Sequence, residues 1–500
     1  MVASLLLRLI ARITTLSIKT WSSRPVQTQE KQFKYLIKRA RRTSFGADHN
    51  FQQISSYKDF VNNVPLREYE GIKPYIERIK KGQRNILWPG KPIYFAITSG
   101  TTSGAKYIPI TKESLKNHLN GAKNAILNYV AQTKRTSFIK GKFIFIQGSP
   151  LLDKISDILI GRLSGISAHH IPFYMRSKML PTWKTNIIDD WESKIERIVD
   201  ETIDKNMTII SGIPSWVQMY FERVVERNQK KVGDVFQNFN LFIYGGVNYK
   251  PYEKKFKSLI GRKIDSIELF PASEGFYAFQ DNQESKELLL ILNDGIFYEF
   301  IEQKKFHSNI FDRISIAEVR LNINYVLIVS TNAGLWAYNT GDTIKFTSLN
   351  PHRIIVTGRV AQFLSAFGEH VIVKEVELAV EKACVLTGET VNEFTVAPKF
   401  KKGSEMACHE WFIEFAQENP NIQTFQTAID LELQKQNKYY KDLVSGKIIA
   451  PAKVIIIQKG GFNKYMKSIG KLGGQNKIPK ISNNRKVADQ LNKLNLITGS

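Results

Sequence analysis

Short apolar strands alternate with helical patterns through the first half of the chain, and this alternation constrains the fold more than any other feature. The runs 142–147, 207–211 and 240–244 are short and rich in β-branched and aromatic residues, which is typical of buried strands. Amphipathic helical patterns over 191–204 and 216–228 separate them. Strands that alternate with helices predict an α/β fold with a mostly parallel sheet. The carboxyl ends of its strands are where ligands usually bind.

The pattern changes further along the chain. Five strand-like runs follow one another between Leu288 and Ile355 without helical patterns between them, which predicts an antiparallel sheet or a distorted barrel. Beyond Gly358, helical and strand patterns alternate again over 371–384, 410–415, 424–438 and 453–458. We therefore expect a large N-terminal domain over 1–358 and a smaller α/β domain over 359–500.

The composition is that of a globular protein, but the charge is strongly positive. Of the 500 residues, 43% are hydrophobic, and Lys and Arg outnumber Asp and Glu by 71 to 46, for a formal charge of +25. Such an excess fits a nucleic acid, an anionic membrane, a nucleotide cofactor or simply a solvated basic surface. A nucleic-acid-binding protein is thus an alternative from a different class, although the lysines are not grouped with aromatic residues in a recognisable module.

The two cysteines, Cys384 and Cys408, indicate neither a disulfide framework nor a zinc site, so we expect a cytoplasmic protein. In the stretch 1–20, Arg8 and Arg12 interrupt the apolar run. The uninterrupted part is shorter than the ~20 apolar residues that a helix needs to span a bilayer. We expect a basic amphipathic helix that packs on the domain, with contact to a membrane surface as the less favoured alternative.

Three stretches carry residues suited to nucleotide chemistry. The segment Thr98–Gly104 (TSGTTSG) follows a strand, and its small residues and hydroxyls can cradle phosphate oxygens. In 270–275 (FPASEG), Glu274 follows another apolar run and suits Mg²⁺, which takes one or two carboxylates beside phosphate oxygens. In 338–342 (YNTGD), Asp342 follows a glycine turn and can accept ribose hydroxyls.

Each of these motifs also has a purely structural interpretation. The first can be a flexible loop, the second a turn whose acid caps a helix, and the third a plain hairpin turn. A fourth stretch, 473–480 (GGQNKIPK), is a glycine-rich loop whose lysines can deliver positive charge or simply be solvated.

The order and spacing of the four stretches resemble those of the adenylate-forming superfamily of acyl-CoA synthetases and luciferases. Within it, the chain is most similar to the auxin-responsive-promoter family, the Gretchen Hagen acyl acid–amido synthetases. Two further segments, 64–79 and 244–256, also resemble that family, and the resemblance covers about residues 30 to 490. Phe270 and Pro271 depart from the family pattern, and the hinge lysine of the family has no clear equivalent.

The resemblance implies an adenylation domain followed by a smaller mobile domain that rotates between half-reactions. It implies ATP and Mg²⁺ as cofactors, and a nucleotide site formed by Ser99, Gly100, Thr101, Thr102, Ser103, Phe270, Ser273, Tyr338 and Asp342. Glu274 would hold the metal, and Lys477 would be the catalytic lysine.

The implied reaction is ATP-dependent adenylation of a carboxylic acid, followed by transfer of the acyl group to an amine such as an amino acid. An acyl-CoA ligase is the closest alternative, since it shares the first half-reaction. We expect a monomer that binds small molecules and no nucleic acid. The motifs identify neither the acid nor the amine.

Overall fold

The computed structural model describes residues 2–99, 105–188, 190–246, 249–360, 363–364, 366–367, 369, 371–400, 405–445, 448–472 and 477–498. The chain divides into two compact units. The first comprises Met1–Val247 and Gly261–Val356, and the second comprises Asn248–Ile260 and Thr357–Ser500. The α/β class predicted from the strand and helix patterns is confirmed in both units.

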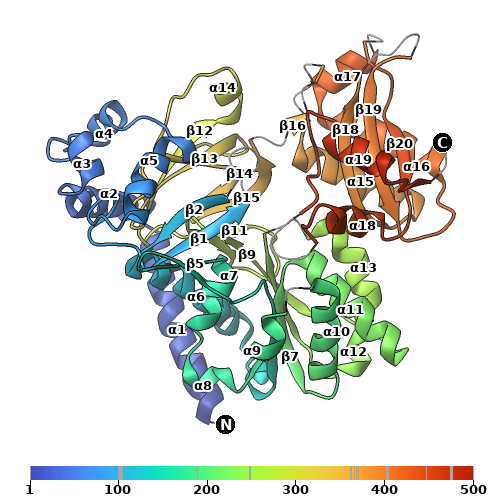
Figure 1. Ribbon diagram of the computed structural model, residues 1–500, viewed down its shortest axis with the longest axis horizontal. Coiled ribbons are helices and arrows are strands. Elements are labelled where there is room, and N and C mark those ends of the chain that lie inside the picture. The colour runs from blue at the N-terminus through green and yellow to red at the C-terminus, as the bar shows by residue number, and fades with distance from the viewer. Residues whose placement is uncertain are drawn as a thin grey trace. The chain divides into compact units, whose positions relative to one another are not determined.

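An eleven-stranded mixed sheet organises the first unit, with the strand order β12-β13-β14-β15-β11-β10-β9-β8-β7-β3-β6 (Figure 1). One half is parallel and contains β6 (Met179–Leu180), β3 (Lys142–Ile146), β7 (Met207–Gly212), β8 (Leu241–Gly245) and β9 (Asp265–Pro271). The other half contains β10 (Phe276–Gln280), β11 (Leu288–Leu290), β12 (Ile296–Glu302), β13 (Asn324–Thr331), β14 (Tyr338–Leu349) and β15 (His352–Arg359). Its pairs β9–β10, β10–β11, β11–β15, β12–β13 and β13–β14 are antiparallel.

The strands that follow Leu288 are therefore an antiparallel continuation of the parallel sheet, and the described strands form no separate barrel. The reason is that β10 pairs with both β9 and β11, which joins the two halves.

Side chains along each strand alternate between the two faces of the sheet, so apolar residues lie on both faces and helices cover them. Leu241 and Ile243 of β8 belong to one apolar cluster with residues of α1 (Val2–Ser22) and α6 (Lys112–Thr133). The intervening Phe242 belongs to the opposite face. The helices α10 (Trp191–Thr202) and α11 (Pro214–Asn228) pack on each other, and α11 also contacts β7.

A second, four-stranded sheet in this unit has the order β2-β1-β5-β4 and comprises β1 (Tyr94–Ser99), β2 (Ala105–Ile110), β4 (Asp153–Ile155) and β5 (Ile158–Gly161). The other helices of the unit are α2 (Pro25–Ala40), α3 (Ser44–Asp48), α4 (Tyr57–Asn63), α5 (Tyr69–Lys80), η1 (Ser137–Lys140), α7 (Leu163–His169), α8 (Phe173–Arg176), α9 (Trp183–Asn186), α12 (Val232–Val235) and α14 (Gln303–His307).

The stretch between α3 and β1 starts with a turn, and α4 begins only at Tyr57. The Asp59 amide donates to Ser56 Oγ at 3.1 Å, and the Ser56 amide donates to Asp59 Oδ2 at 2.9 Å. This capping box fixes the start of α4 at Tyr57, so a turn precedes the helix.

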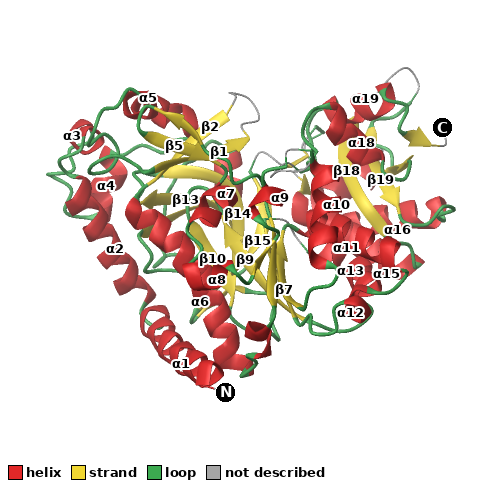
Figure 2. Ribbon diagram, turned by 60° about the horizontal axis from the view of Figure 1, so that its bottom comes forward, coloured by secondary structure: helices red, strands yellow, loops and turns green. Residues whose placement is uncertain are grey.

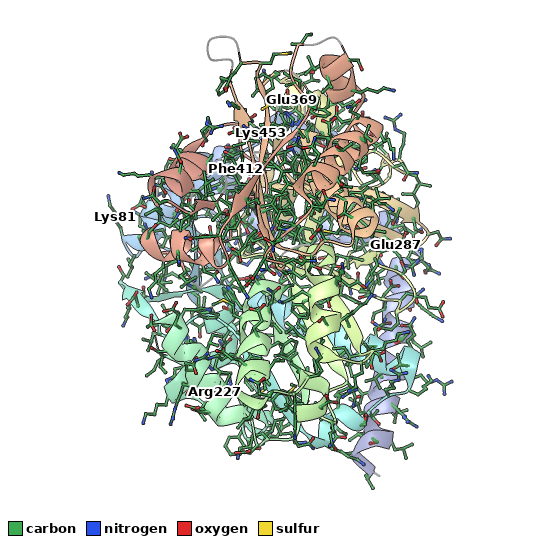
Figure 3. The ribbon with its side chains drawn as sticks, turned by 90° about the vertical axis from the view of Figure 1, so that its right-hand side faces the viewer. Lys81, Arg227, Glu287, Glu369, Phe412 and Lys453 are labelled. Atoms are coloured by element: carbon green, nitrogen blue, oxygen red, sulfur yellow. The ribbon has the colours of Figure 1, made fainter. Side chains whose placement is uncertain are left out.

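The second unit has three layers around the sheet β18-β19-β20-β21, formed by β18 (Val391–Lys399), β19 (Cys408–Phe415), β20 (Lys453–Ile457) and β21 (Ile497–Thr498). Trp411 and Ile413 of β19 face a cluster with α15 (Val373–Thr387) and α16 (Ile422–Gln436). Phe412, labelled in Figure 3, faces the opposite cluster with α18 (Gly461–Ser468) and α19 (Lys486–Lys493). The unit also contains α13 (Lys250–Ile260), α17 (Lys438–Ser445), β16 (Phe363–Leu364) and β17 (Val371–Ile372).

A buried ion pair ties the loop after α14 to the main sheet. Arg313 and Glu299 are both almost inaccessible to solvent, and their charged groups lie 3.1 Å apart. Arg313 also donates to the carbonyl oxygens of Val61 and Val64, and Tyr57 donates to Glu299 at 3.2 Å. These bonds satisfy groups whose desolvation would otherwise be costly.

Asp294, next to β12, is a buried carboxyl group that gives a stability prediction. Burial raises its pKa to about 6, against the opposing effect of Lys123 and Lys116. Since this pKa lies above the unfolded value, the folded state binds more protons between about pH 4 and 6, and its stability falls as the pH rises through that window. We expect Asp294→Asn to stabilise the protein by about 1–2 kcal/mol at pH 7.5, because the buried charge is removed.

Urea unfolding at pH 7.5 and at pH 5 measures this effect. The stabilisation by Asp294→Asn should shrink at pH 5, where the folded wild type already holds the proton. An equal stabilisation at both pH values would contradict the assigned titration.

Candidate active site

Glu274, the acid of the FPASEG motif, lies in a tight hairpin at the carboxyl end of β9 in the main sheet. The amide of Ala272 donates to the Gly275 carbonyl at 2.8 Å, and the amide of Gly275 donates back at 3.3 Å, so Ser273 and Glu274 form the loop between β9 and β10. A side chain at Gly275 would lie 2.6 Å from Ile296 and 2.9 Å from the Tyr277 ring, which explains the glycine. Glu274 therefore sits in a β-hairpin and caps no helix.

The acid of the YNTGD motif is presented by a bulge within a strand and not by a hairpin turn. Val326 and Ile328 of β13 pair with Thr343 and Asn339, so three residues of β14 stand opposite one of β13. Gly341 has a φ of +77°, which a glycine adopts without strain.

Side-chain hydrogen bonds hold this bulge in place. The Thr340 hydroxyl donates to the Leu327 carbonyl at 2.9 Å, and the Gly341 amide donates to Asn339 Oδ1 at 2.9 Å. The Asp342 amide donates to Thr340 Oγ1 at 3.1 Å. These bonds therefore fix the backbone on both sides of Asp342, whose side chain is largely buried.

Tyr277 of β10 brings the two motifs together. Burial is the largest cause that raises the pKa of this tyrosine well above its ordinary value, and the charges of Glu274 and Asp342 are the next two. Both carboxylates therefore lie within electrostatic range of one phenol. The Tyr277 hydroxyl is buried and has no hydrogen-bond partner among the described residues. A buried orphan of this kind is rare and requires an explanation.

The aromatic residues predicted to flank the nucleotide lie in the same region. Phe270 packs on Tyr277 with ring centroids 5.1 Å apart. Tyr338 also contributes to the raised pKa of Tyr277, and it is almost fully buried at the start of β14. Ser273 is buried beside Glu274 in the hairpin. The structure thus gathers Phe270, Ser273, Glu274, Tyr338 and Asp342 in the first unit.

The TSGTTSG segment joins β1 and β2, which form an antiparallel hairpin in which Ser99 pairs with Ala105. Gly100, Thr101, Thr102 and Ser103 lie outside the described residues, and Ser99 is described by its backbone. Beyond the loop, Lys106 lies over the Tyr69 ring with its Nζ 5.9 Å from the centroid.

Lys477 belongs to the second unit, where it is exposed and a firmly attached segment follows it. Ile478 is buried in the cluster with α18 and α19. The Lys480 carbonyl accepts from the Val396 amide at 3.0 Å, and the Lys480 side chain forms a partly buried ion pair with Glu393. Burial alone would lower the pKa of Lys480, but Glu393 and Tyr252 outweigh it and raise this pKa.

Sequence reasoning missed Arg162, which lies between β5 and α7. Burial lowers the pKa of its guanidinium, and it has no acidic or hydrogen-bonding partner among the described residues. A side chain at Gly148, which follows β3, would lie 3.0 Å from Arg162 Cδ. The nearby Ser164 hydroxyl is buried and also lacks a partner among the described residues. Only the packing reveals this cation, because no motif marks it.

The residues of the site fit a single magnesium ion better than a protein-held metal cluster. The described residues contain no group of three or more His, Cys, Asp or Glu side chains that could hold a metal. Magnesium needs no such group, since one or two carboxylates suffice beside phosphate oxygens and water. The carboxylates of Glu274 and Asp342 near one buried phenol are compatible with that chemistry.

Comparison with solved structures identifies the fold. The chain matches a GH3.15 acyl acid amido synthetase with a TM-score of 0.80 at 15% identity, over 98% of this chain and 97% of that one. A 2-hydroxyisobutyryl-CoA ligase in its postadenylation state matches with a TM-score of 0.57 at 12% identity, over 93% and 90% of the two chains.

Sequence relatives cover nearly the same length. A jasmonoyl–L-amino acid synthetase, GH3.5, of Oryza sativa subsp. japonica is 22% identical over 511 residues, which is 85% of this chain and 87% of the relative. An indole-3-acetic acid-amido synthetase, GH3.3, of Arabidopsis thaliana is 21% identical over 532 residues, 90% of this chain and 88% of the relative.

Three domains of one family match in order along the chain. The GH3 family N-terminal domain matches residues 16–178, the central domain residues 289–359, and the C-terminal domain residues 374–486. These matches cover well over half of the sequence and confirm the resemblance drawn from the motifs. The chain belongs to the GH3 family.

Proposed function

We propose that this protein is an ATP-dependent acyl acid–amido synthetase, which adenylates a carboxylic acid and passes the acyl group to an amino acid. The observation that carries the proposal is that Tyr277 has a buried, unpartnered hydroxyl and lies within electrostatic range of both Glu274 and Asp342. The named activities of its GH3 relatives support the same reaction.

We infer that the protein acts as a cytoplasmic monomer, and its two free cysteines are compatible with a reducing compartment.

The proposed roles follow from the chemistry of each group. The loop with Ser99, Gly100, Thr101, Thr102 and Ser103 would cradle the ATP phosphates, as consecutive amides and hydroxyls can. Asp342 would accept the ribose hydroxyls, and Phe270, Ser273 and Tyr338 would line the nucleotide. Glu274 would hold Mg²⁺, which when bound neutralises phosphate charge.

In the first half-reaction, an oxygen of the acid attacks the α-phosphorus of ATP, and the bond to pyrophosphate breaks. Two anions must approach each other, so the barrier is largely electrostatic. One pair of unit charges at ~4 Å is worth about 4 kcal/mol at an effective dielectric near 20. Lys477, held by the anchored segment 478–482, would supply such a positive charge to the reacting phosphate.

In the second half-reaction, the amine nitrogen attacks the acyl carbonyl carbon, AMP leaves with the electron pair of the broken bond, and the nitrogen loses a proton. The domains that we propose, 1–358 for adenylation and 359–500 as the mobile part, would separate the two steps by moving Lys477 away. Water must be excluded meanwhile, since it would hydrolyse the mixed anhydride.

Arg162 is our candidate for recognition of the amino acid's carboxylate. That carboxylate keeps its charge through both half-reactions, whereas the acyl carboxylate loses its charge on adenylation, so a permanent cation suits the former. Arg162 lies beside Gly148 at the carboxyl end of β3, and Glu274 follows β9 at the same edge. Three strand spacings of ~4.8 Å separate β3 from β9, about 14 Å in all, which is the scale of an extended acyl-adenylate with its acceptor.

Lys477→Ala tests the role of the lysine. We expect acid-dependent ATP–pyrophosphate exchange to slow by at least ~100-fold with ATP binding retained, as when one transition-state donor is lost. Lys471→Ala, an exposed lysine of the same unit, is the matched control and should exchange normally. Normal exchange by Lys477→Ala would remove this residue from the mechanism.

The same exchange assay, run with a panel of carboxylic acids, identifies the acids that are adenylated. Supplying either amino acids or coenzyme A to the adenylate then separates an amido synthetase from an acyl-CoA ligase.

Tyr277→Phe tests whether the orphan hydroxyl serves the ligand. Without ligand, removing an unpaired buried hydroxyl should stabilise the protein by about 1 kcal/mol in urea unfolding. The same change should weaken binding of a non-reactive acyl-adenylate analogue in calorimetry, because the ligand loses a hydrogen-bond partner. Tyr298→Phe is the control, since its hydroxyl is equally buried and unpartnered but is near Asp294 and not the site carboxylates. Equal analogue affinity in both variants would refute the role of Tyr277.

Arg162→Ala should separate the two half-reactions. We expect unchanged ATP–pyrophosphate exchange and a KM for the amino acid that rises roughly 10- to 100-fold, the effect of losing a charged hydrogen bond. An amino acid amide, which lacks the carboxylate, should be used equally by wild type and variant. A fall in exchange, or an equal loss with the amide, would contradict this assignment.

A further inference from the structure

Helix α1 exposes a continuous apolar stripe. Seven large apolar side chains of this helix are between 42% and 80% exposed: Val2, Leu5, Leu6, Leu9, Ile10, Ile13 and Leu16. Their spacing of three and four residues places them on one face of a helix with 3.6 residues per turn. Isolated exposed apolar residues are common on proteins, but a contiguous exposed patch of this kind marks an interaction surface.

The opposite face of α1 packs on the first unit, so the stripe is the face that this packing leaves exposed. Ala11 and Ile18 are buried in the cluster that α6 and β8 share. Arg8 donates to the Lys134 carbonyl at 2.8 Å, beyond the end of α6. Figures 1 and 2 show α1 running beside α6 along the outside of the first unit, with one side turned away from it.

The charge of α1 points to the kind of partner. The helix contains Arg8, Arg12 and Lys19 and no acidic residue. At 3.6 residues per turn, these three cations fall along one edge of the apolar stripe, between the exposed and the buried face. An apolar face bordered by cations is the arrangement of helices that lie in the interface of an anionic membrane.

We propose that α1 lies flat on an anionic lipid surface, with its apolar stripe among the acyl chains and its cations at the lipid phosphates. No helix among the described residues is long and apolar enough to cross a membrane, which agrees with a helix that lies on the surface. A second copy of the chain is the poorer occupant, since two α1 helices packed through their stripes would bring like charges together. This inference does not depend on the proposed enzymatic activity.

Vesicle flotation with the full chain tests the proposal. We expect the protein to float with vesicles of equal parts phosphatidylcholine and phosphatidylserine. With pure phosphatidylcholine its binding should be weaker by roughly fivefold for each cation that contacts the lipid. Raising the salt concentration should weaken binding to the anionic vesicles.

Two variants divide the surface into its parts. The triple change Leu5→Ser, Leu9→Ser and Ile13→Ser should reduce binding by at least ~10-fold, because it removes buried apolar area. The pair Arg12→Gln and Lys19→Gln should reduce the preference for anionic lipid by roughly 25-fold while the stripe remains, at about fivefold for each cation removed. Val385→Ser with Leu386→Ser, which changes two exposed apolar residues of α15, is the matched control and should bind as the wild type does.

Several outcomes would overturn the proposal: no flotation of the wild type, equal binding by the triple variant, or equal binding to neutral vesicles. A concentration-dependent dimer in light scattering, abolished by the triple change and without flotation, would assign the stripe to a second copy. The ATP–pyrophosphate exchange of the triple variant should match the wild type, which distinguishes loss of the surface from loss of the fold.

Discussion

The change of the main sheet from parallel to antiparallel, at the hairpin between β9 and β10, is the constraint on which the candidate site depends. Parallel strands β3, β7, β8 and β9 end at one edge of the sheet, and the chain must leave that edge after each of them. After β9 it reverses within two residues. The reversal holds Ser273 and Glu274 at the edge where ligands bind in open α/β sheets.

The second acid reaches the same region by a different device. Asp342 lies on β14, several strands away in the sheet order, in a bulge with three residues opposite one, and its charge still reaches Tyr277. The hydrogen bonds of Asn339 and Thr340 to the backbone hold the bulge. The hairpin after β9 and the bulge in β14 thus carry the two acids of the site, Glu274 and Asp342. The regular strands between them fix how far apart these two acids lie.

The cations of the chain have distinct roles, although the composition presents them as one excess. Arg313 forms a buried ion pair and Lys480 a partly buried one, and both pairs stabilise the fold. Arg162 is partly buried without a partner among the described residues, which suits a substrate anion. Arg12 and Lys19 are exposed beside the apolar stripe of α1. A net charge of +25 therefore does not require a nucleic-acid partner.

The sequence by itself determined the α/β class, the strands β3, β7 and β8, the helices α10, α11, α15 and α16, and the residues of the motifs, because periodicity and short-range capping depend on neighbours along the chain. The capping box at Ser56 and the apolar runs of β3, β7 and β8 are local in this sense. Tertiary structure alone decided that Asp342 stands on a bulge, since a bulge is defined by the register between β13 and β14. It also decided that Tyr277 and Arg162 lack partners among the described residues, and that α1 leaves seven large apolar side chains exposed while it buries Ala11 and Ile18. The solvent exposure of a side chain and the hydrogen bonds of a buried polar group depend on residues that are distant in the sequence. A local sequence pattern does not identify those residues.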